Sequence, residues 1–285
     1  MTAHHAHPHM NTPVRSAIAA LLLGLLALTS PLVHAGRSCE TRPVTAQSLE
    51  RGLSLAQQTT MALNATDANV VLLARAGQDL TQYRLKWSHL SWAYRTQDAD
   101  GRSVWRVVHK LNTCGTREAS VYRQGLGEFF LDDPWRYEAA WVIPSQAVQD
   151  QMLPLLQDDA KATRLHYAPY SIVSYAWGQK YQQSNQWAIE TLALAMEAGV
   201  TGRQRAQAWI QHQGYEPTAL NIGPFTRLGG RIGAANVAFD DHPNEKRYAD
   251  RIETVTADSV FTWLKHSGLG GSPQRLQLRF PLPQD

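Results

Sequence analysis

The sequence lacks a strong excess of charge, because 27 Lys and Arg stand against 24 Asp and Glu. The small formal charge of +3 and the absence of a basic run argue against a nucleic-acid-binding protein. A Gly-rich phosphate loop, an HExxH motif and a GxSxG motif are also missing. The run 240–243 (Asp-Asp-His-Pro) contains metal-binding residue types but is more typical of a turn. We therefore expect no cofactor and no metal ion.

An apolar run long enough to span a bilayer is missing as well. The run over residues 17–28 has 12 residues, whereas a membrane-spanning helix needs roughly 20. It follows a polar stretch whose one charged residue is Arg15, and it precedes a small-x-small site ending at Ala35. This order is typical of a secretory signal peptide. We predict that residues 1–35 are a signal peptide and that no membrane anchor remains; a retained N-terminal anchor is the alternative.

The predicted mature chain, residues 36–285, is long enough for one large domain. Removal of the signal peptide takes away one arginine and no acidic residue, which lowers the formal charge from +3 to +2. All nine tryptophans lie in the mature part, which favours a firmly packed core over a carbohydrate-binding surface. We expect a single domain that works in the periplasm of a Gram-negative bacterium.

Cysteine is scarce, since Cys39 and Cys114 are the only two in the sequence. In an oxidising compartment a lone pair of cysteines most often forms a disulfide. We therefore predict a Cys39–Cys114 bond that joins the start of the mature chain to the middle of the fold. If the bond does not form, Cys114 is available as a nucleophile.

Hydrophobic periodicity predicts an α+β domain. Residues 69–74 form a short apolar run that is typical of a buried strand. Residues 88–95 and 104–111 alternate between apolar and polar side chains on either side of a turn, which predicts an antiparallel hairpin. Helices are further expected over residues 45–63, 145–156, 185–198, 202–213 and 258–266, strands over 139–143 and 170–175, and a loop over 125–134.

His89 is the strongest candidate for chemistry. It shares one face of a predicted strand with Ser91 and Ala93, whose small side chains leave room for a cleft. A histidine in such a place can act as a general base. His109 lies beside His89 if the hairpin pairs as predicted and would then fix the tautomer of the base, a role for which Asn112 is a rival. Both histidines can instead be structural.

Ser184 stands at the start of a predicted helix. A nucleophile at that position gains from the helix dipole and from free backbone N–H groups. Asn185 and Gln186 lie at the same helix end and can donate hydrogen bonds to a substrate. The simpler interpretation of Ser184 is a helix N-cap.

Two short segments, RAGQDL (75–80) and WSHL (87–90), resemble the signature of the circularly permuted papain-like hydrolases of the NlpC type. In those enzymes a second polar residue, here matched by His109, follows on the next strand, and a nucleophilic cysteine begins a later helix. The resemblance implies a papain-like antiparallel sheet packed against helices. The matching helix has no cysteine: Ser184 or Gln186 takes its place, depending on the register.

Almost the whole mature chain also resembles a bacterial family known as domain of unknown function 2145. This resemblance implies an exported protein and assigns no activity. The matching segments are GRSCE, RAGQDL, WSHLSWAYR, LNTCGT, YRQGL, FFLDDP, SNQWAIE, NVAFDDHP and RIETVTADSVFTWL.

Two functions are consistent with these features. The missing cysteine favours a binding or accessory protein of the cell envelope, whose papain-like cleft binds a cell-wall peptide, a glycan or an envelope protein. The alternative is a cell-wall peptide amidase or peptidase in which His89 is the base, His109 orients it, and Ser184 or Cys114 is the nucleophile. The residues expected to contact the ligand are Tyr83, Trp87, Asn185 and Gln186.

Overall fold

The structure is a computed structural model that describes residues 44–132 and 134–278. The chain divides into two units, Met1–Val33 and His34–Asp285, and all described residues belong to the second unit. The predicted signal peptide and Cys39 lie outside the described residues. Within the described ranges, no helix combines the length and the apolar character that crossing a membrane requires.

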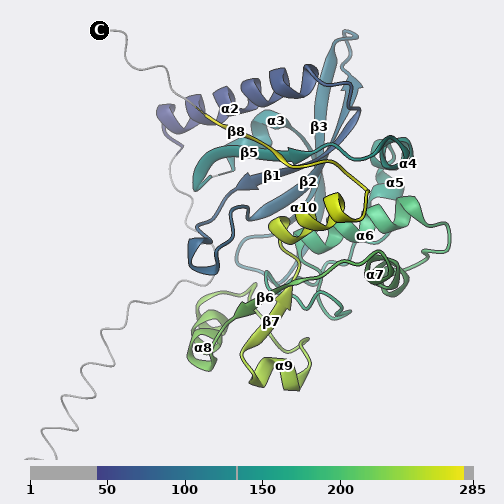
Figure 1. Cartoon of the computed structure of the whole chain (residues 1–285). Helices are drawn as coiled ribbons and strands as arrows, with labels where there is room; N and C mark the ends of the chain where they lie inside the picture. The colour runs from purple at the N-terminus through teal and green to yellow at the C-terminus, as the bar shows by residue number, and fades with distance from the viewer. Residues whose placement is uncertain (1–43, 133, 279–285) are drawn as a thin grey trace, which may run out of the picture. The chain divides into compact units, whose positions relative to one another are not determined.

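A six-stranded sheet forms the centre of the described unit, and every neighbouring pair of its strands is antiparallel (Figure 1). The predicted hairpin is confirmed, since Trp92 pairs with Val108 and Ala93 with Val107. In sheet order the strands are β4 (Ala119–Gly125), β3 (Ser103–Asn112), β2 (His89–Gln97), β1 (Val70–Ala76), β5 (Arg136–Val142) and β8 (Gln274–Gln277).

Helices cover both faces of this sheet, which explains why all seven residues of β1 are buried. Along β1, Leu73 packs into the cluster on the side of α2 and α3, and Leu72 into the cluster on the side of α4, α6 and α10. The helices on the first face are α2 (Ala46–Asn64) and α3 (Leu126–Leu131); those on the second are α4 (Gln146–Gln157), α6 (Ser184–Met196) and α10 (Ala257–His266), with α7 (Arg203–His212) packed on α6 and the short α5 (Asp159–Ala162) after α4.

A buried polar network joins α6 to the sheet and to α7. Lys110 of β3 is fully buried, and its Nζ donates to Gln182 Oε1 at 2.8 Å. Gln182 in turn donates to Glu190, which forms an ion pair of 2.8 Å with Arg203 of α7. Burial, together with the charge of Arg203, lowers the pKa of Lys110 to about 6. The network therefore holds a lysine that is largely neutral at pH 7.

A small second sheet lies beside the main one in Figure 1. Its two strands are antiparallel, and Leu220 and Ile252 pair in register. Both residues belong to a separate apolar cluster that also contains Phe239. The elements of this region are β6 (Thr218–Asn221), α8 (Pro224–Gly233), α9 (Asn244–Tyr248) and β7 (Arg251–Thr254), and the 3-10 turn η1 is Thr81–Tyr83.

Two sequence predictions were wrong. The segment 125–134, expected to be a loop, contains α3, whose first turn is closed by Glu128 accepting from the Gly125 N–H at 3.0 Å. The segment 170–175, expected to be a strand, is irregular, because its backbone bonds to loops: Tyr170 N–H donates to Arg117 at 2.7 Å. The architecture nevertheless matches the expected class, a single mixed α+β domain with an antiparallel sheet packed on helices.

Candidate functional site

The two candidate histidines meet on the α2/α3 face of the sheet. His89 Nε2 lies 2.9 Å from His109 Nδ1, and His109 Nε2 lies 2.7 Å from Gln124 Oε1. We call these three residues the histidine chain. His109 is fully buried and His89 is 8 % exposed. The histidine chain therefore links strands β2, β3 and β4 by side-chain hydrogen bonds.

The alternation of strand residues explains this meeting. His89 begins β2 and pairs with Arg75 of β1, so the two side chains stand on one face of the sheet. His109 of β3 lies on the same face, and the ring of Phe129 from α3 covers it with 5.3 Å between ring centroids. Arg75 donates to the Phe129 carbonyl and forms an ion pair with Asp132. The guanidinium of Arg75 and the ring of Phe129 thus cover the histidine chain on the side away from the sheet.

The hydrogen bonds fix the tautomers of both imidazoles. A glutamine carbonyl oxygen can only accept, so His109 Nε2 carries the hydrogen that bonds to Gln124. His109 Nδ1 is then an acceptor, and His89 Nε2 must donate to it. The hydrogen on Nε2 leaves His89 Nδ1 with a lone pair, and this atom bonds to no described residue. The histidine chain therefore ends at His89 Nδ1, which can accept a hydrogen bond.

Both histidines are neutral at physiological pH. Burial lowers the pKa of His89 well below its usual 6.5, and the charge of Arg75 and the presence of His109 lower it further. Burial and Arg75 also lower the pKa of His109 to about 4, although Gln124 and Asp132 oppose the shift. A general base works best when its pKa lies near the operating pH. His89 is therefore a weak base in this setting.

Ser184 lies on the other face of the sheet. It begins α6, and Trp187 of that helix packs with Leu90 and Trp92 rather than with the histidines. Ser184 is buried and hydrogen bonds to Tyr170, whose pKa is raised by burial. The structure thus does not bring Ser184 to His89. The N-cap of α6 is Gln183, so Ser184 is not the cap either.

Asn185 and Gln186 are buried, and their polar atoms bond to the fold. Asn185 Oδ1 accepts from the Leu90 N–H at 2.8 Å, and its Nδ2 donates to Val255 at 3.2 Å. Gln186 Oε1 accepts from Ser174 at 2.9 Å. These side chains fasten the start of α6 to strand β2 and to neighbouring loops.

Cys114 lies in the exposed turn after β3 and is not a free cysteine. Its predicted partner Cys39 lies outside the described residues, so the disulfide stays a prediction.

An open groove does exist beside Trp87, with a volume of about 460 Å³. Its floor is apolar, because Trp87 and Phe261 are both buried. Tyr83, predicted to contact the same ligand as Trp87, packs on the apolar cluster of the small sheet and does not line this groove. The Trp87 groove is lined by Lys86, Trp87, Ala140, Asp258, Phe261, Thr262, Lys265, His266, Pro273, Gln274 and Arg275.

Cations dominate the rim of the Trp87 groove. Arg275 lies over the Trp87 ring, 6.0 Å from its centroid, and forms an ion pair of 2.6 Å with Glu138. Asp258 accepts from the Trp87 N–H at 3.2 Å, and burial raises the pKa of its carboxyl group. Lys86 and Lys265 are exposed and form no ion pair with a described residue. The groove therefore keeps a positive charge.

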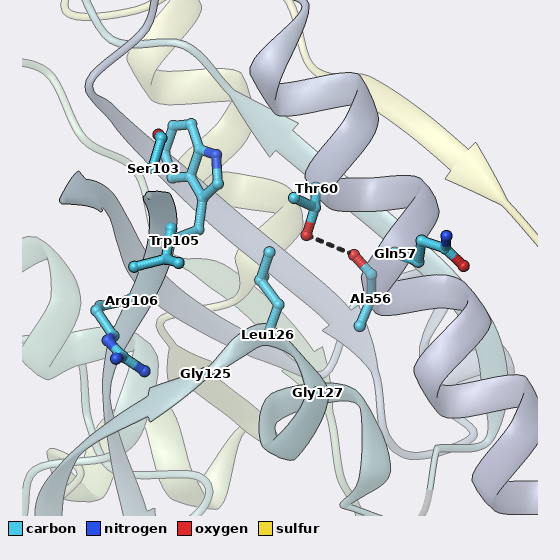
Figure 2. A pocket seen from close by; sticks show the side chains of 10 residues that line it. Ala56, Gln57, Thr60, Ser103, Trp105, Arg106, Gly125, Leu126 and Gly127 are labelled. Atoms are coloured by element: carbon cyan, nitrogen blue, oxygen red, sulfur yellow. Dashed lines mark hydrogen bonds between the residues drawn. The ribbon is translucent and has the colours of Figure 1, made fainter. Parts of the chain in front are cut away.

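A second, smaller cavity of about 280 Å³ lies between α2, β3 and the start of α3 (Figure 2). Trp105 and Leu126 line it, and Arg106 is its one charged lining residue. Trp105 Nε1 donates to Asn64 Oδ1 at 2.9 Å, so the indole is already bonded. Although the cavity lies on the face of the histidine chain, neither histidine lines it.

In the run 240–243, Asp241 and His242 are hydrogen bonded within the fold. Asp241 Oδ1 lies 3.0 Å from His242 Nδ1, and Asp241 Oδ2 accepts from the Tyr175 N–H at 2.7 Å. Across the described parts of the chain, no three His, Cys, Asp or Glu side chains gather closely enough to hold a metal ion.

The sequence predicts Trp87 as a binding residue but not the cations of the Trp87 groove. Lys86 adjoins Trp87 in the sequence, and this adjacency is the one local signal of a basic neighbour. Lys265 and Arg275 give no such signal, because they come from α10 and β8, and only the packing of α10 and β8 near Trp87 brings them to it.

The geometry defines an α+β protein with a neutral histidine chain buried on one face of its sheet and an open basic groove at the other. A family model described as "Uncharacterized protein conserved in bacteria (DUF2145)" matches residues 62–264. The chain belongs to this family, as its resemblance predicted. No curated protein and no solved structure matches the chain.

Proposed function

We propose that this protein is a periplasmic binding protein of the cell envelope, not a hydrolase, and that the Trp87 groove takes a peptide with a free carboxylate. Cell-wall peptides belong to this class. The observation that carries the proposal is the contrast between two places. The residues that a hydrolase would use, His89 and Ser184, are buried on opposite faces of the sheet, whereas the groove is open and basic.

The chemistry of the groove supports a ligand with one anionic end and one apolar end. Its volume of about 460 Å³ falls within the range of small-ligand sites, roughly 300–1,000 Å³. The exposed ammonium groups of Lys86 and Lys265 can attract a carboxylate, while Trp87 and Phe261 offer an apolar floor. A peptide C-terminus beside an aliphatic side chain meets both requirements.

The fold relation that we propose is a papain-like frame without its catalytic pair. Two features support it: a histidine-bearing strand followed by a strand with a second histidine, and a later helix whose start is fastened to the first of these strands. The frame departs from an enzyme because His89 points away from α6. Ser184 lies across the sheet from His89, so the histidine cannot take the proton of the hydroxyl during attack.

Calorimetric titration of the mature protein with a cell-wall stem peptide tests the proposal. We expect saturable binding of the peptide with a free C-terminal carboxylate and binding about tenfold weaker for the amidated peptide. Lys265→Glu should weaken binding of the free acid by a similar factor. The matched control is Lys161→Glu, which reverses an exposed lysine on α5 and should leave binding unchanged.

Chromatography of the same mixtures gives the second readout. Release of a cleavage product by the wild type, lost in His89→Ala, would overturn the binding proposal in favour of an amidase or peptidase. Equal affinity of the wild type and Lys265→Glu for the free acid would show that the Trp87 groove is not the site.

A further inference from the structure

Helix α8 presents an apolar ridge to solvent. Phe225, Leu228 and Ile232 are 87 %, 57 % and 79 % exposed. Their spacing of three and four residues places all three side chains on one side of the helix. Isolated exposed apolar residues are common on protein surfaces, but three large ones in a row on one short helix form a continuous stripe.

The ridge points away from the body of the protein. The opposite side of α8 makes the internal contacts: Gly230 is its one buried residue, and Arg227 donates to Asp250 at 2.6 Å. On a helical projection Gly230 lies roughly opposite Leu228 and Ile232. In Figure 1, α8 lies at the outer edge of the small sheet. The apolar stripe is therefore convex, and none of the described helices or strands lies over it.

The charge of the helix selects among possible occupants. Helix α8 contains Arg227 and Arg231 and no acidic residue, and Arg231 is exposed on the flank of the stripe without an ion pair to any described residue. Apolar side chains flanked by arginine are typical of helices that lie in the surface of a membrane. Basic residues near such a surface favour anionic lipids.

We propose that α8 is an interfacial anchor that inserts Phe225, Leu228 and Ile232 into the surface of a bilayer containing anionic phospholipid. A protein partner would need a groove shaped to this ridge, and a second copy of the chain would present the same convex ridge. A fluid bilayer adapts to a convex helix without such a match. The inference rests on the proposed location in the envelope but not on the ligand of the Trp87 groove.

Vesicle sedimentation tests the anchor, with the mature protein purified from the cell envelope. The probes are phosphatidylcholine vesicles and vesicles with about a third of phosphatidylglycerol. We expect the anionic vesicles to bind the protein and the double change Phe225→Ser/Ile232→Ser to lower the partition coefficient at least tenfold, since burial of each of these side chains is worth about a factor of ten or more. Arg231→Glu should weaken binding to the anionic vesicles alone.

Two further measurements keep the test specific. Met61→Ser removes another exposed apolar side chain, on α2, and should leave the partition coefficient unchanged. Hydrogen exchange should show protection over residues 224–233 when anionic vesicles are added.

Three outcomes would overturn the inference. The wild type could fail to bind both kinds of vesicle; the double variant could bind as well as the wild type; or the wild type could self-associate in analytical ultracentrifugation through α8, which would assign the ridge to a second copy. Lys265→Glu separates the two proposals, because it should weaken peptide binding and leave the contribution of α8 to vesicle binding intact.

Discussion

His109 has a hydrogen-bond partner on each side of its ring and no exposed surface. In the folded protein such a ring resists protonation, because a second hydrogen on Nδ1 would face the hydrogen on His89 Nε2. The nearby guanidinium of Arg75 adds to this resistance. The histidine chain is thus a structural set of hydrogen bonds. It lowers the stability of the fold only when the solution is acidic enough to protonate these histidines in the unfolded protein.

Stability should therefore depend on pH in a defined window. The unfolded chain takes up protons near the ordinary histidine pKa of 6.5, whereas the folded chain resists until about pH 4 at His109 and also well below 6.5 at His89. The contribution is fully present above pH 6.5 and is lost as the pH falls through this window, at up to ~1.4 kcal/mol per pH unit for each histidine. Urea unfolding between pH 7.5 and 4.5 measures it.

The variant His109→Gln isolates one member of the chain. Glutamine cannot titrate, so the slope of unfolding free energy against pH should fall by about 1.4 kcal/mol per pH unit in this window. His212→Gln, which makes the same substitution on the exposed surface of α7, serves as the matched control. An unchanged slope in His109→Gln would mean that His109 titrates alike in the folded and unfolded chains.

At the scale of elements, the start of α6 is fastened by Asn185. This side chain is the hydrogen-bond acceptor for the Leu90 N–H and a donor to the Val255 carbonyl, so it connects the helix with β2 and with the chain before α10. A papain-like enzyme places its nucleophile at such a helix start. In this chain the same position supports the packing of three segments.

Asn185→Ala should destabilise the protein by about 2 kcal/mol, because it leaves the buried Leu90 N–H without its partner, whereas the Val255 carbonyl still accepts from Gln183 Nε2. Ser184→Ala should cost only about 1 kcal/mol, the usual net value of one hydrogen bond. Denaturant midpoints of the two variants provide the comparison. If Ser184→Ala lowered the unfolding free energy more than Asn185→Ala, Ser184 rather than Asn185 would be the residue that fastens the start of α6.

The sequence predicted elements well where their pattern is regular and long. The hairpin of β2 and β3 was found because its alternation extends over both strands, and this also placed His89 and His109 on one face. Helix α3 was missed because it has only six residues and follows a glycine. The face on which α6 packs could not be inferred, because it depends on tertiary packing, and that choice separates Ser184 from His89.

At the scale of the whole molecule, the family and the α+β class followed from the sequence, since long motifs and the order of elements carry both. The Trp87 groove did not, because its cations are brought together from distant parts of the chain. Neither motif spacing nor periodicity reports a contact between residues as far apart as Glu138 and Arg275, which are separated by 137 positions.

The prediction for the whole chain is that it is exported and loses its signal peptide. Protein recovered from the periplasmic fraction should begin at Gly36, which intact-mass measurement can establish. Ala35→Phe should block cleavage and leave the longer precursor, because the cleavage site needs a small residue there. The matched control, His34→Ser, changes the neighbouring position, where any side chain is tolerated. A periplasmic product that still contains Ala17 would show that the leader is retained.

The short edge strand β8 gives the groove a further property. It has four residues, pairs with β5 alone among the described strands, and brings Arg275 to the rim. Short edge strands open more readily than central ones. The groove is complete only in molecules in which β8 is paired with β5. The observed affinity therefore equals the intrinsic affinity multiplied by the fraction of such molecules. Ligand and strand should therefore stabilise each other, and binding should slow hydrogen exchange along the β5–β8 pair.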